Sequence, residues 1–201
     1  RRGGIGSGSR GGVTTLMHDE GIKEPLGRSS ETVRATIWSR QSGRLAGIAA
    51  ADHLMREWMP GATWDWMVGD GADIEAGKII LAIEGGREQI LVAERMLLNM
   101  VGRLSGIATN TLRWSTAAEP MRVAATRKVH WGLLDKWAVH LGGGLTHRLT
   151  RSDSRMIKEN DLSGMIREGE KRPKAVARVV RELELDSVGG FIVLEVGTID
   201  E

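Results

Sequence analysis

Residues 121–160 read MRVAATRKVHWGLLDKWAVHLGGGLTHRLTRSDSRMIKEN, and this stretch decides the fold because short apolar runs alternate in it with polar loops and a helical segment. The same alternation continues almost to the end of the chain. Its periodicity predicts strands at 122–125, 155–158 and 190–196, with helices at 133–140 and 174–183. Strands that alternate with helices are typical of an α/β fold with a parallel sheet, either a barrel or an open doubly wound sheet.

The length of this C-terminal region limits how much of a barrel it can form. A closed barrel of eight strand–helix units needs roughly 200 residues or more by itself. Only the residues from Met121 to Glu201 follow Pro120, which is far fewer. We therefore expect an incomplete, truncated α/β barrel of parallel strands.

The chain before Pro120 predicts a small α+β sandwich domain. Residues 32–38 alternate between apolar and more polar side chains, which is the period of a half-buried strand. Residues 48–59 form an amphipathic pattern that Pro60 ends, as expected of a helix. Two further strands are predicted from apolar residues that alternate along 63–68 and 78–84, namely Trp64, Trp66 and Val68, then Ile79, Leu81 and Ile83.

Residues 90–118 lack proline and are rich in Leu, Met, Ala and Ile, which predicts a largely buried helical segment. It forms either two helices or one helix that bends near Gly102 or Gly106. Polar residues recur along it every four positions, at Arg95, Asn99 and Arg103. Such a stripe is either a solvated face or a row of side chains directed into a site or across a subunit boundary.

Composition places the chain among folded globular proteins, with 201 residues of which 41% are hydrophobic. We expect a flexible Gly-rich arm at 1–12, an N-terminal domain with linking helices at 13–118 and a partial barrel at 119–201. The 28 Lys and Arg nearly balance 26 Asp and Glu, which argues against a general nucleic-acid binder. The chain has no cysteine and no apolar run of roughly 18 residues, so we expect a cytoplasmic protein with no membrane contact.

Residues with chemistry to offer gather where the predicted parallel strands end. Thr126, Arg127 and Lys128 follow one strand, His147 and Arg148 follow a glycine run, Lys158 and Asn160 end another strand, and Glu195 ends the last. In parallel α/β folds that rim is where substrates bind. An arginine grips a carboxylate or phosphate with two hydrogen bonds, and a lysine adds a compact charge. The pattern predicts a pocket for an anion with several charges.

Plainer interpretations of the same residues remain open. An Arg-Lys pair after a strand is often ordinary surface charge, and the glycines at 142–144 are compatible with a simple helix stop. Lys158 and Glu195 are harder to dismiss, because each lies in an apolar strand where an unpaired buried charge costs several kcal/mol. We therefore expect these two residues to be paired with each other, with a neighbour or with a ligand.

Five blocks of the chain, in order, resemble the signature blocks of the quinolinate phosphoribosyltransferase family (nicotinate-nucleotide pyrophosphorylase, decarboxylating). They are ERMLLN at 94–99, LSGIAT at 104–109, TRK at 126–128, GGG with THRL at 142–149 and IKEN at 157–160. Leu45-Ala46-Gly47 and the turn at 70–77 extend the resemblance into the N-terminal half. The resemblance implies an N-terminal sandwich domain followed by an incomplete barrel, in a homodimer or higher homo-oligomer with shared active sites.

By the same resemblance, the chain transfers phosphoribose from phosphoribosyl pyrophosphate to quinolinate with decarboxylation, giving nicotinate mononucleotide, pyrophosphate and CO2. Lys128, Lys158 and Glu195 would be catalytic, with Glu195 near ribose hydroxyls or the Mg2+ that accompanies pyrophosphate. The implied substrate-binding residues are Thr126, Arg127, His147, Arg148 and Asn160, together with Arg95, which reaches the partner's site.

Several positions depart from the family pattern, and each would weaken the pocket. Gly12 stands where the family has Asp, residues 129–131 replace a Thr-rich stretch, Asp161 replaces a His, and Arg155 interrupts an apolar strand. The chain also stops soon after Glu195, before a further family strand and a phosphate loop. Alternatives are therefore a relative that acts on another carboxylated ring or has a transport-associated role, an inactive or truncated homologue that folds and dimerises, and a lipoyl-type carrier built on the hairpin at 70–77.

Overall fold

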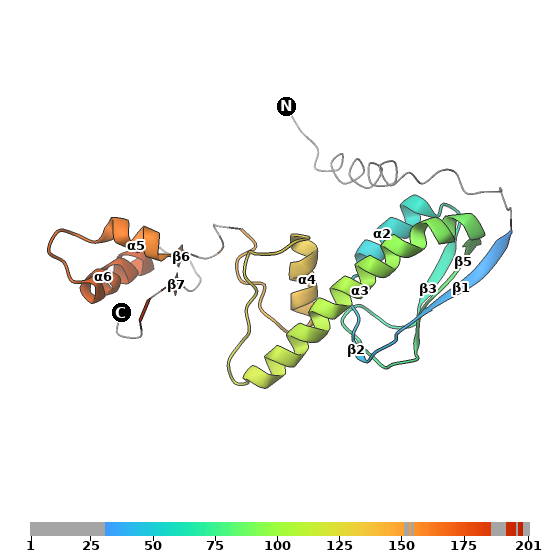
Figure 1. The fold of residues 1–201 in the computed structure, drawn as a ribbon, viewed down its shortest axis with the longest axis horizontal. Coiled ribbons are helices and arrows are strands. Elements are labelled where there is room, and N and C mark those ends of the chain that lie inside the picture. Colours follow the sequence, from blue (N-terminus) through green and yellow to red (C-terminus); the bar gives the residue numbers. More distant parts are fainter. Residues whose placement is uncertain (1–30, 151–152, 154, 186–191, 196, 199–201) are drawn as a thin grey trace, which may run out of the picture. The chain divides into compact units, whose positions relative to one another are not determined.

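The computed structural model describes residues 31–150, 153, 155–185, 192–195 and 197–198 (Figure 1). The predicted arm at 1–12, with Gly12, lies outside these residues. The chain divides into two compact units. In the described part, the first unit contains 31–41, 48–69 and 74–101, and the second contains 42–47, 70–73 and the residues from 102 onward.

The first unit contains a three-stranded antiparallel sheet in the order β1 (Thr32–Trp38), β5 (Ile79–Gly86) and β3 (Thr63–Trp66). Burial alternates along β1 as predicted. The predicted alternation is wrong for β5, because Ile79 is 47% exposed and residues 80–83 are all buried. As the middle strand, β5 has a neighbour on each edge, and the small side chain of Ala82 is buried between the exposed residues Thr36 and Asp65 of those neighbours.

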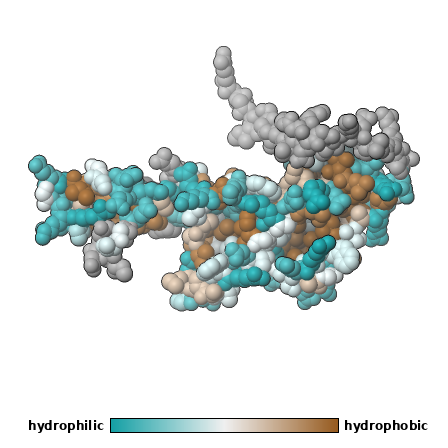
Figure 2. Space-filling model, in the orientation of Figure 1, coloured by the Kyte–Doolittle hydropathy of each residue, from teal (hydrophilic) through white to brown (hydrophobic). Residues whose placement is uncertain are grey.

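The described part of this unit also contains helix α2 (Ile48–Trp58) and the amino-terminal part of helix α3 (Arg87–Ala118). Helix α3 is a single helix, so the alternative of two helices is wrong; Gly102 and Gly106 both lie within it. Its buried residues in the first unit recur at helical spacing, at Ile90, Ala93, Leu97 and Val101. Leu91 is exposed, and Figure 2 shows further hydrophobic residues at the surface near α3.

The second unit begins with two short segments, 42–47 and 70–73, that join the carboxyl-terminal part of α3. Strand β2 (Gly43–Arg44) pairs with β4 (Asp73–Ile74). The Arg44 guanidinium donates to Asp73 Oδ1 at 3.0 and 2.9 Å, and its backbone N–H donates to Thr109 Oγ1 at 2.8 Å. Gly47 has φ 106°, and a Cβ there would lie 2.7 Å from a methyl of Leu104, so only glycine suits this position.

Parallel pairing follows, as the sequence predicted. Ala124 and Leu145 form an isolated parallel bridge, and β6 (Met156–Ile157) pairs in parallel with β7 (Val193–Leu194). The predicted strand at 122–125 is therefore reduced to one bridge, and the strands at 155–158 and 190–196 are shorter among the described residues. Arg155 lies before β6 and does not interrupt it. The helices are α4 (Leu133–Leu141), α5 (Glu159–Met165) and α6 (Arg172–Leu185).

Helix α5 was not predicted, and its position is explained by one apolar anchor and one cap. Leu162 is fully buried in a small cluster with Ile157, Val176 and Val179, against which residues of α6 and β7 pack. The Asp161 carboxylate accepts a hydrogen bond from the Lys158 backbone N–H at 2.9 Å, which stabilises the first turn. Within the described residues even α3, the longest helix, does not combine the length and apolarity that a membrane span requires.

Candidate anion-binding site

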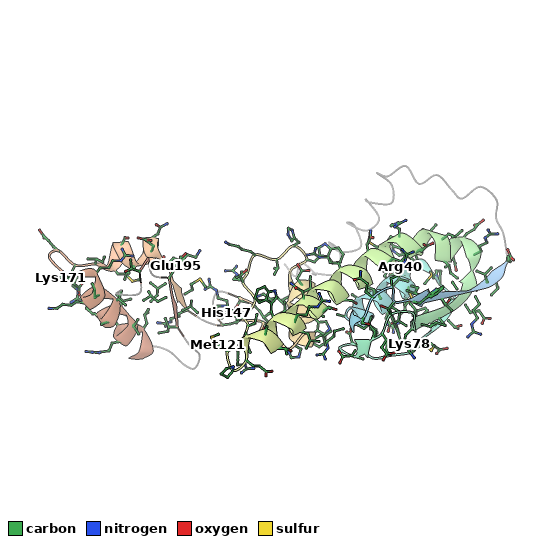
Figure 3. All side chains as sticks on the ribbon, turned by 60° about the horizontal axis from the view of Figure 1, so that its bottom comes forward. Arg40, Lys78, Met121, His147, Lys171 and Glu195 are labelled. Atoms are coloured by element: carbon green, nitrogen blue, oxygen red, sulfur yellow. The ribbon has the colours of Figure 1, made fainter. Side chains whose placement is uncertain are left out.

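A cavity of about 760 Å³ lies in the second unit. Most of its polar lining residues follow the parallel segments just described. Its lining includes seven residues that the sequence predicted for the site: Thr126, Arg127, Lys128, His147, Arg148, Lys158 and Glu195. Figure 3 labels two of them, His147 and Glu195, which come from different segments of the unit. The cations predicted from separate blocks of sequence are therefore brought together.

Backbone hydrogen bonds explain why these side chains meet. Leu145 N–H donates to the Val123 carbonyl and Ala125 N–H donates to the Leu145 carbonyl, each at 2.8 Å, which is a parallel register. Loops that follow parallel segments leave the same edge. We call residues 126–128 the first loop and residues 146–148 the second loop.

The other half of the cavity uses the same principle. Val193 N–H donates to the Arg155 carbonyl at 3.0 Å and Glu195 N–H donates to the Ile157 carbonyl at 2.9 Å. Lys158 follows β6 and Glu195 follows β7, so both residues leave the same end of the parallel pair. Both side chains are exposed. The expectation of two buried strand charges is therefore wrong, because each two-residue strand ends before its charged residue begins.

Thr126 stabilises the tight turn of the first loop. Its Oγ1 accepts a hydrogen bond from the Lys128 backbone N–H at 3.1 Å, and Val129 N–H donates to the Arg127 carbonyl at 3.0 Å. The side chains of Arg127 and Lys128 are exposed, so both cations are available to an anion in the cavity.

The second loop has an uncommon backbone. His147 and Arg148 have φ values of 21° and 32°, in the left-handed region that non-glycine residues seldom adopt. Such residues cost about 1–3 kcal/mol each and gather at functional sites. Arg148 is half-buried, and its Nη2 lies 3.6 Å from Met156 Sδ, which directs the side chain towards β6.

Beneath the two loops lies a lysine that sequence reasoning missed. Lys136 in α4 is only 3% exposed. Its Nζ donates to the backbone carbonyls of Ala125 and His147, each at 3.1 Å, and to the carbonyl of Thr146. Burial lowers the pKa of Lys136 below its ordinary value, and the nearby charge of Arg127 lowers it further.

The neighbouring Asp135 is also buried, and it holds the chain that follows the first loop. Its carboxylate accepts hydrogen bonds from Arg103 at 3.2 and 2.9 Å, from His130 N–H at 2.9 Å and from Trp131 N–H at 3.1 Å. Burial alone would raise the pKa of Asp135, but the hydrogen bonds from Arg103 and the two N–H groups outweigh it and hold that pKa below its ordinary value.

Arg103 resolves part of the question about the polar stripe on α3. It is bound to Asp135, and its guanidinium lies 5.0 Å from the centre of the Trp131 ring. Arg103 therefore supports the segment at 129–131, one of the departures from the family pattern. Asn99 and Arg95 are exposed and belong to the first unit. Asn160 lies exposed in the first turn of α5, and it is not among the lining residues of the cavity.

The glycine run does more than end a helix. Gly142 caps α4 by donating its N–H to the Ala138 carbonyl at 3.1 Å, as the helix-stop interpretation predicted. A Cβ on Gly144 would lie 2.7 Å from Thr111 Cγ2 and 2.8 Å from Val139 Cγ1. The close approach of α3 to the start of the second loop therefore requires glycine.

Among the described residues, the carboxylates that line the cavity are those of Asp161 and Glu195. In the part of the chain that the structure describes, no group of three or more His, Asp or Glu residues is arranged to hold a metal ion. Because Asp161 already caps α5, a divalent cation here would need most of its oxygen ligands from a bound anion.

Comparisons with known proteins identify relatives of both halves of the chain. Residues 13–105 match the family described as "Quinolinate phosphoribosyl transferase, N-terminal domain", and residues 107–199 match its "C-terminal domain". "Quinolinate phosphoribosyltransferase [decarboxylating] 2b, mitochondrial" of Nicotiana tabacum is 36% identical over 179 residues, covering 88% of this chain and 49% of the relative. The chain thus spans about half the length of this curated relative.

Solved structures give the same result for the fold. The nicotinate-nucleotide pyrophosphorylase from Francisella tularensis is 27% identical, with a TM-score of 0.73 over 94% of this chain and 68% of that chain. NadC from Streptococcus pyogenes, at 23% identity, has a TM-score of 0.74 over 98% and 70% of the two chains. The predicted fold class, an α+β sandwich domain followed by part of an α/β barrel, is confirmed.

Proposed function

The chain belongs to the quinolinate phosphoribosyltransferase family, and from that premise we propose that its cavity binds quinolinate and phosphoribosyl pyrophosphate. The reaction is the transfer of phosphoribose to the ring nitrogen with loss of CO2, giving nicotinate mononucleotide and pyrophosphate for NAD biosynthesis. The observation that carries the proposal is the convergence of Arg127, Lys128, Arg148 and Lys158 on one cavity.

The two arginines suit the two carboxylates of quinolinate. Arg127 comes from the first loop and Arg148 from the second, so two guanidinium groups approach one ligand from different segments. Each can bind a carboxylate with two parallel hydrogen bonds. A ring held at both carboxylates has its nitrogen in a fixed orientation, which favours attack on the ribose carbon.

The remaining cations suit the leaving group. When the bond between the ribose carbon and pyrophosphate breaks, its electron pair leaves with pyrophosphate, and the ring nitrogen forms the new bond to carbon. Lys128 and Lys158 stabilise the negative charge that gathers on pyrophosphate, and Glu195 offsets the positive charge on the sugar. The carboxylate beside the ring nitrogen then leaves as CO2. Its bonding electrons pass to the positively charged ring, and that carbon takes up a proton.

Mg2+ is part of the proposal. Mg2+ is bound in proteins by one or two carboxylates together with substrate phosphates. Glu195 and Asp161 both line the cavity, and Glu195 would hold Mg2+ together with oxygens of pyrophosphate. Bound there, Mg2+ would add positive charge to the pyrophosphate oxygens.

The proposal also includes a homodimer in which Arg95 of one subunit reaches the partner's cavity. Arg95 is exposed on α3, as a residue that serves another subunit must be. The cytoplasmic location stays a prediction, since relatives carry names that include "mitochondrial" and "chloroplastic".

Calorimetry with quinolinate tests this function through two exposed lysines. Lys158→Ala and Lys171→Ala each remove one positive charge from an exposed position. Only Lys158 lines the cavity, so Lys171→Ala is the matched control. We expect the unaltered chain and Lys171→Ala to bind quinolinate in the micromolar range and Arg127→Ala to bind it below detection. Lys158→Ala should bind it several-fold more weakly than the unaltered chain, because the Lys158 ammonium adds to the positive charge of the cavity even without pyrophosphate. The proposal would be refuted if the unaltered chain showed no heat of quinolinate binding, or if both lysine variants lost affinity for quinolinate equally. If a ring with one carboxylate bound more tightly than quinolinate, the cavity would be assigned to a substrate with one carboxylate.

A further inference from the structure

Lys136 lies beneath the candidate site without lining it, and it binds the residue directly before the first loop and residues of the second loop. We propose that Lys136 is a positioning residue whose buried ammonium fixes the spacing of the first and second loops. This spacing makes the cavity select a ring with two carboxylates over a ring with one. The inference rests on the proposed function and adds to it the residue that sets its specificity.

The hydrogen bonds of Lys136 leave no donor for a substrate. An ammonium group has three N–H donors, and three backbone carbonyls accept from it. One carbonyl belongs to Ala125, directly before the first loop, and the other two belong to Thr146 and His147 in the second loop. With 3% of its surface exposed, Lys136 can act on a ligand only through these loops.

The hydrogen bonds of Lys136 lie close to the place where the segments that carry the two loops pair. The strands that carry them pair through one isolated bridge, between Ala124 and Leu145. The bridge fixes the register of the two segments at one point, before the two loops begin. Lys136 adds hydrogen bonds on both sides, just where the strands end and the loops begin.

The strained backbone of the second loop is explained by the same ammonium. The carbonyls of two consecutive residues, Thr146 and His147, are directed at one nitrogen, and the φ values of His147 and Arg148 are positive. The hydrogen bonds to a charged donor offset the cost of that conformation. The direction in which Arg148 leaves the backbone thus depends on Lys136.

The chemistry of the site explains why the spacing matters. A ligand with two carboxylates gains from both loops only when Arg127 and Arg148 are held at the separation that it requires. Fixing that separation in advance removes the ordering cost that binding would otherwise carry. A ligand with one carboxylate is held by one loop, so its affinity depends little on the distance to the other.

Calorimetry with two ligands tests this selectivity. Lys136→Met keeps an unbranched side chain of similar length without the charge, and we expect its affinity for quinolinate to fall by about tenfold or more, as expected when preorganisation of two contacts is lost. The affinity for nicotinate, which has one carboxylate, should fall much less. Equal factors of loss for both ligands would overturn the inference, because partial unfolding weakens both in proportion.

Chemical rescue separates the ammonium from the space that it fills. The chain contains no cysteine, so Lys136→Cys carries a single thiol. Alkylation of the unfolded variant with 2-bromoethylamine, followed by refolding, restores an ammonium at the length of lysine. Alkylation with 1-bromopropane gives a neutral side chain of the same length. We expect only the first product to recover the preference for quinolinate, and equal recovery by the propyl product would contradict the role of the charge.

Hydrogen exchange keeps this inference distinguishable from the proposed function. Lys136→Met should speed amide exchange in residues 125–128 and 146–148 while leaving α3 as protected as before. If the unaltered chain binds no quinolinate but these loops exchange faster in the variant, the proposed function fails and the tie between the loops stands. If quinolinate binds and loop exchange is unchanged, the positioning role fails and the proposed function stands.

Discussion

The sheet of the first unit and the cavity region of the second unit are built by different forces. In the first unit, β5 pairs with β1 from Thr32 to Trp38 and with β3 on its other edge, over a core of aliphatic side chains. In the cavity region, one isolated bridge joins the segments that carry the two loops, and the buried charges of Lys136 and Asp135 bind backbone groups beside it.

Because the two regions are stabilised differently, they should respond differently to pH and to the removal of charge. Apolar burial is not directional and does not titrate, so the first unit should tolerate changes of pH and of single surface charges. Hydrogen bonds to buried charges are directional, and removing one partner leaves the other unsatisfied. The cavity region should therefore be the part that responds to charge removal and to acid.

The largest effect should come from the core of the first unit. Leu97 in α3 is 1% exposed, so Leu97→Ala removes buried methyl groups and should lower the free energy of unfolding by about 3 kcal/mol. Leu91→Ala, on the same helix at 57% exposure, is the matched control and should change it by less than about 0.5 kcal/mol. Urea unfolding followed by tryptophan fluorescence measures both. Equal losses would mean that apolar burial does not hold this unit.

The next largest effect should come from the carboxylate that supports the first loop. Asp135→Asn removes the charge that binds Arg103 and at least one acceptor for the N–H groups of His130 and Trp131. A buried group left unsatisfied costs about 1–3 kcal/mol. Amide exchange at residues 127–131 should therefore speed up well before global unfolding. Asp65→Asn, at an exposed position in β3, should leave exchange unchanged, and a similar response of both variants would remove the contrast between the regions.

The same contrast decides what the sequence could predict. The alternation along β1 and the meeting of Arg127, Arg148, Lys158 and Glu195 were predictable, because a period of two and the shared edge of parallel strands are geometric rules that hold without knowing the packing. The domain boundaries and the catalytic and binding roles of all the predicted site residues, Arg95 and Asn160 included, stay predictions.

The supports of the site were not predictable from the pattern of α4. Leu133 is 68% exposed and Trp137 is 45% exposed, while Asp135 and Lys136 are buried. Periodicity assigns apolar residues to the core and charged residues to solvent, so for α4 it predicts burial of the face that is in fact exposed. The charges are buried because backbone groups and Arg103 bind them, and such partners come from distant segments that no local pattern reveals.

The smallest effect should come from an ion pair at the far end of the second unit. Arg178 donates to Glu170 at 2.9 and 2.8 Å, and these hydrogen bonds, with one from Arg167 N–H, lower the pKa of Glu170 to about 2. A lowered carboxyl pKa means that its contribution to stability is fully present above its unfolded value, near 4.5, and is lost as pH falls through about 2.

Protection factors of the Val176 and Val179 amides, corrected for intrinsic exchange at each pH, measure this local stability. They should fall between pH 4.5 and pH 2 in the unaltered chain, while Glu170→Gln should show lower protection at pH 6 and a shallower fall. Glu168→Gln, at an exposed neighbouring position, should keep the steep fall. Because both amides belong to an apolar cluster, a flat profile in the unaltered chain would show that aliphatic packing alone holds α6. This end of the second unit would then resemble the first unit in how it is stabilised.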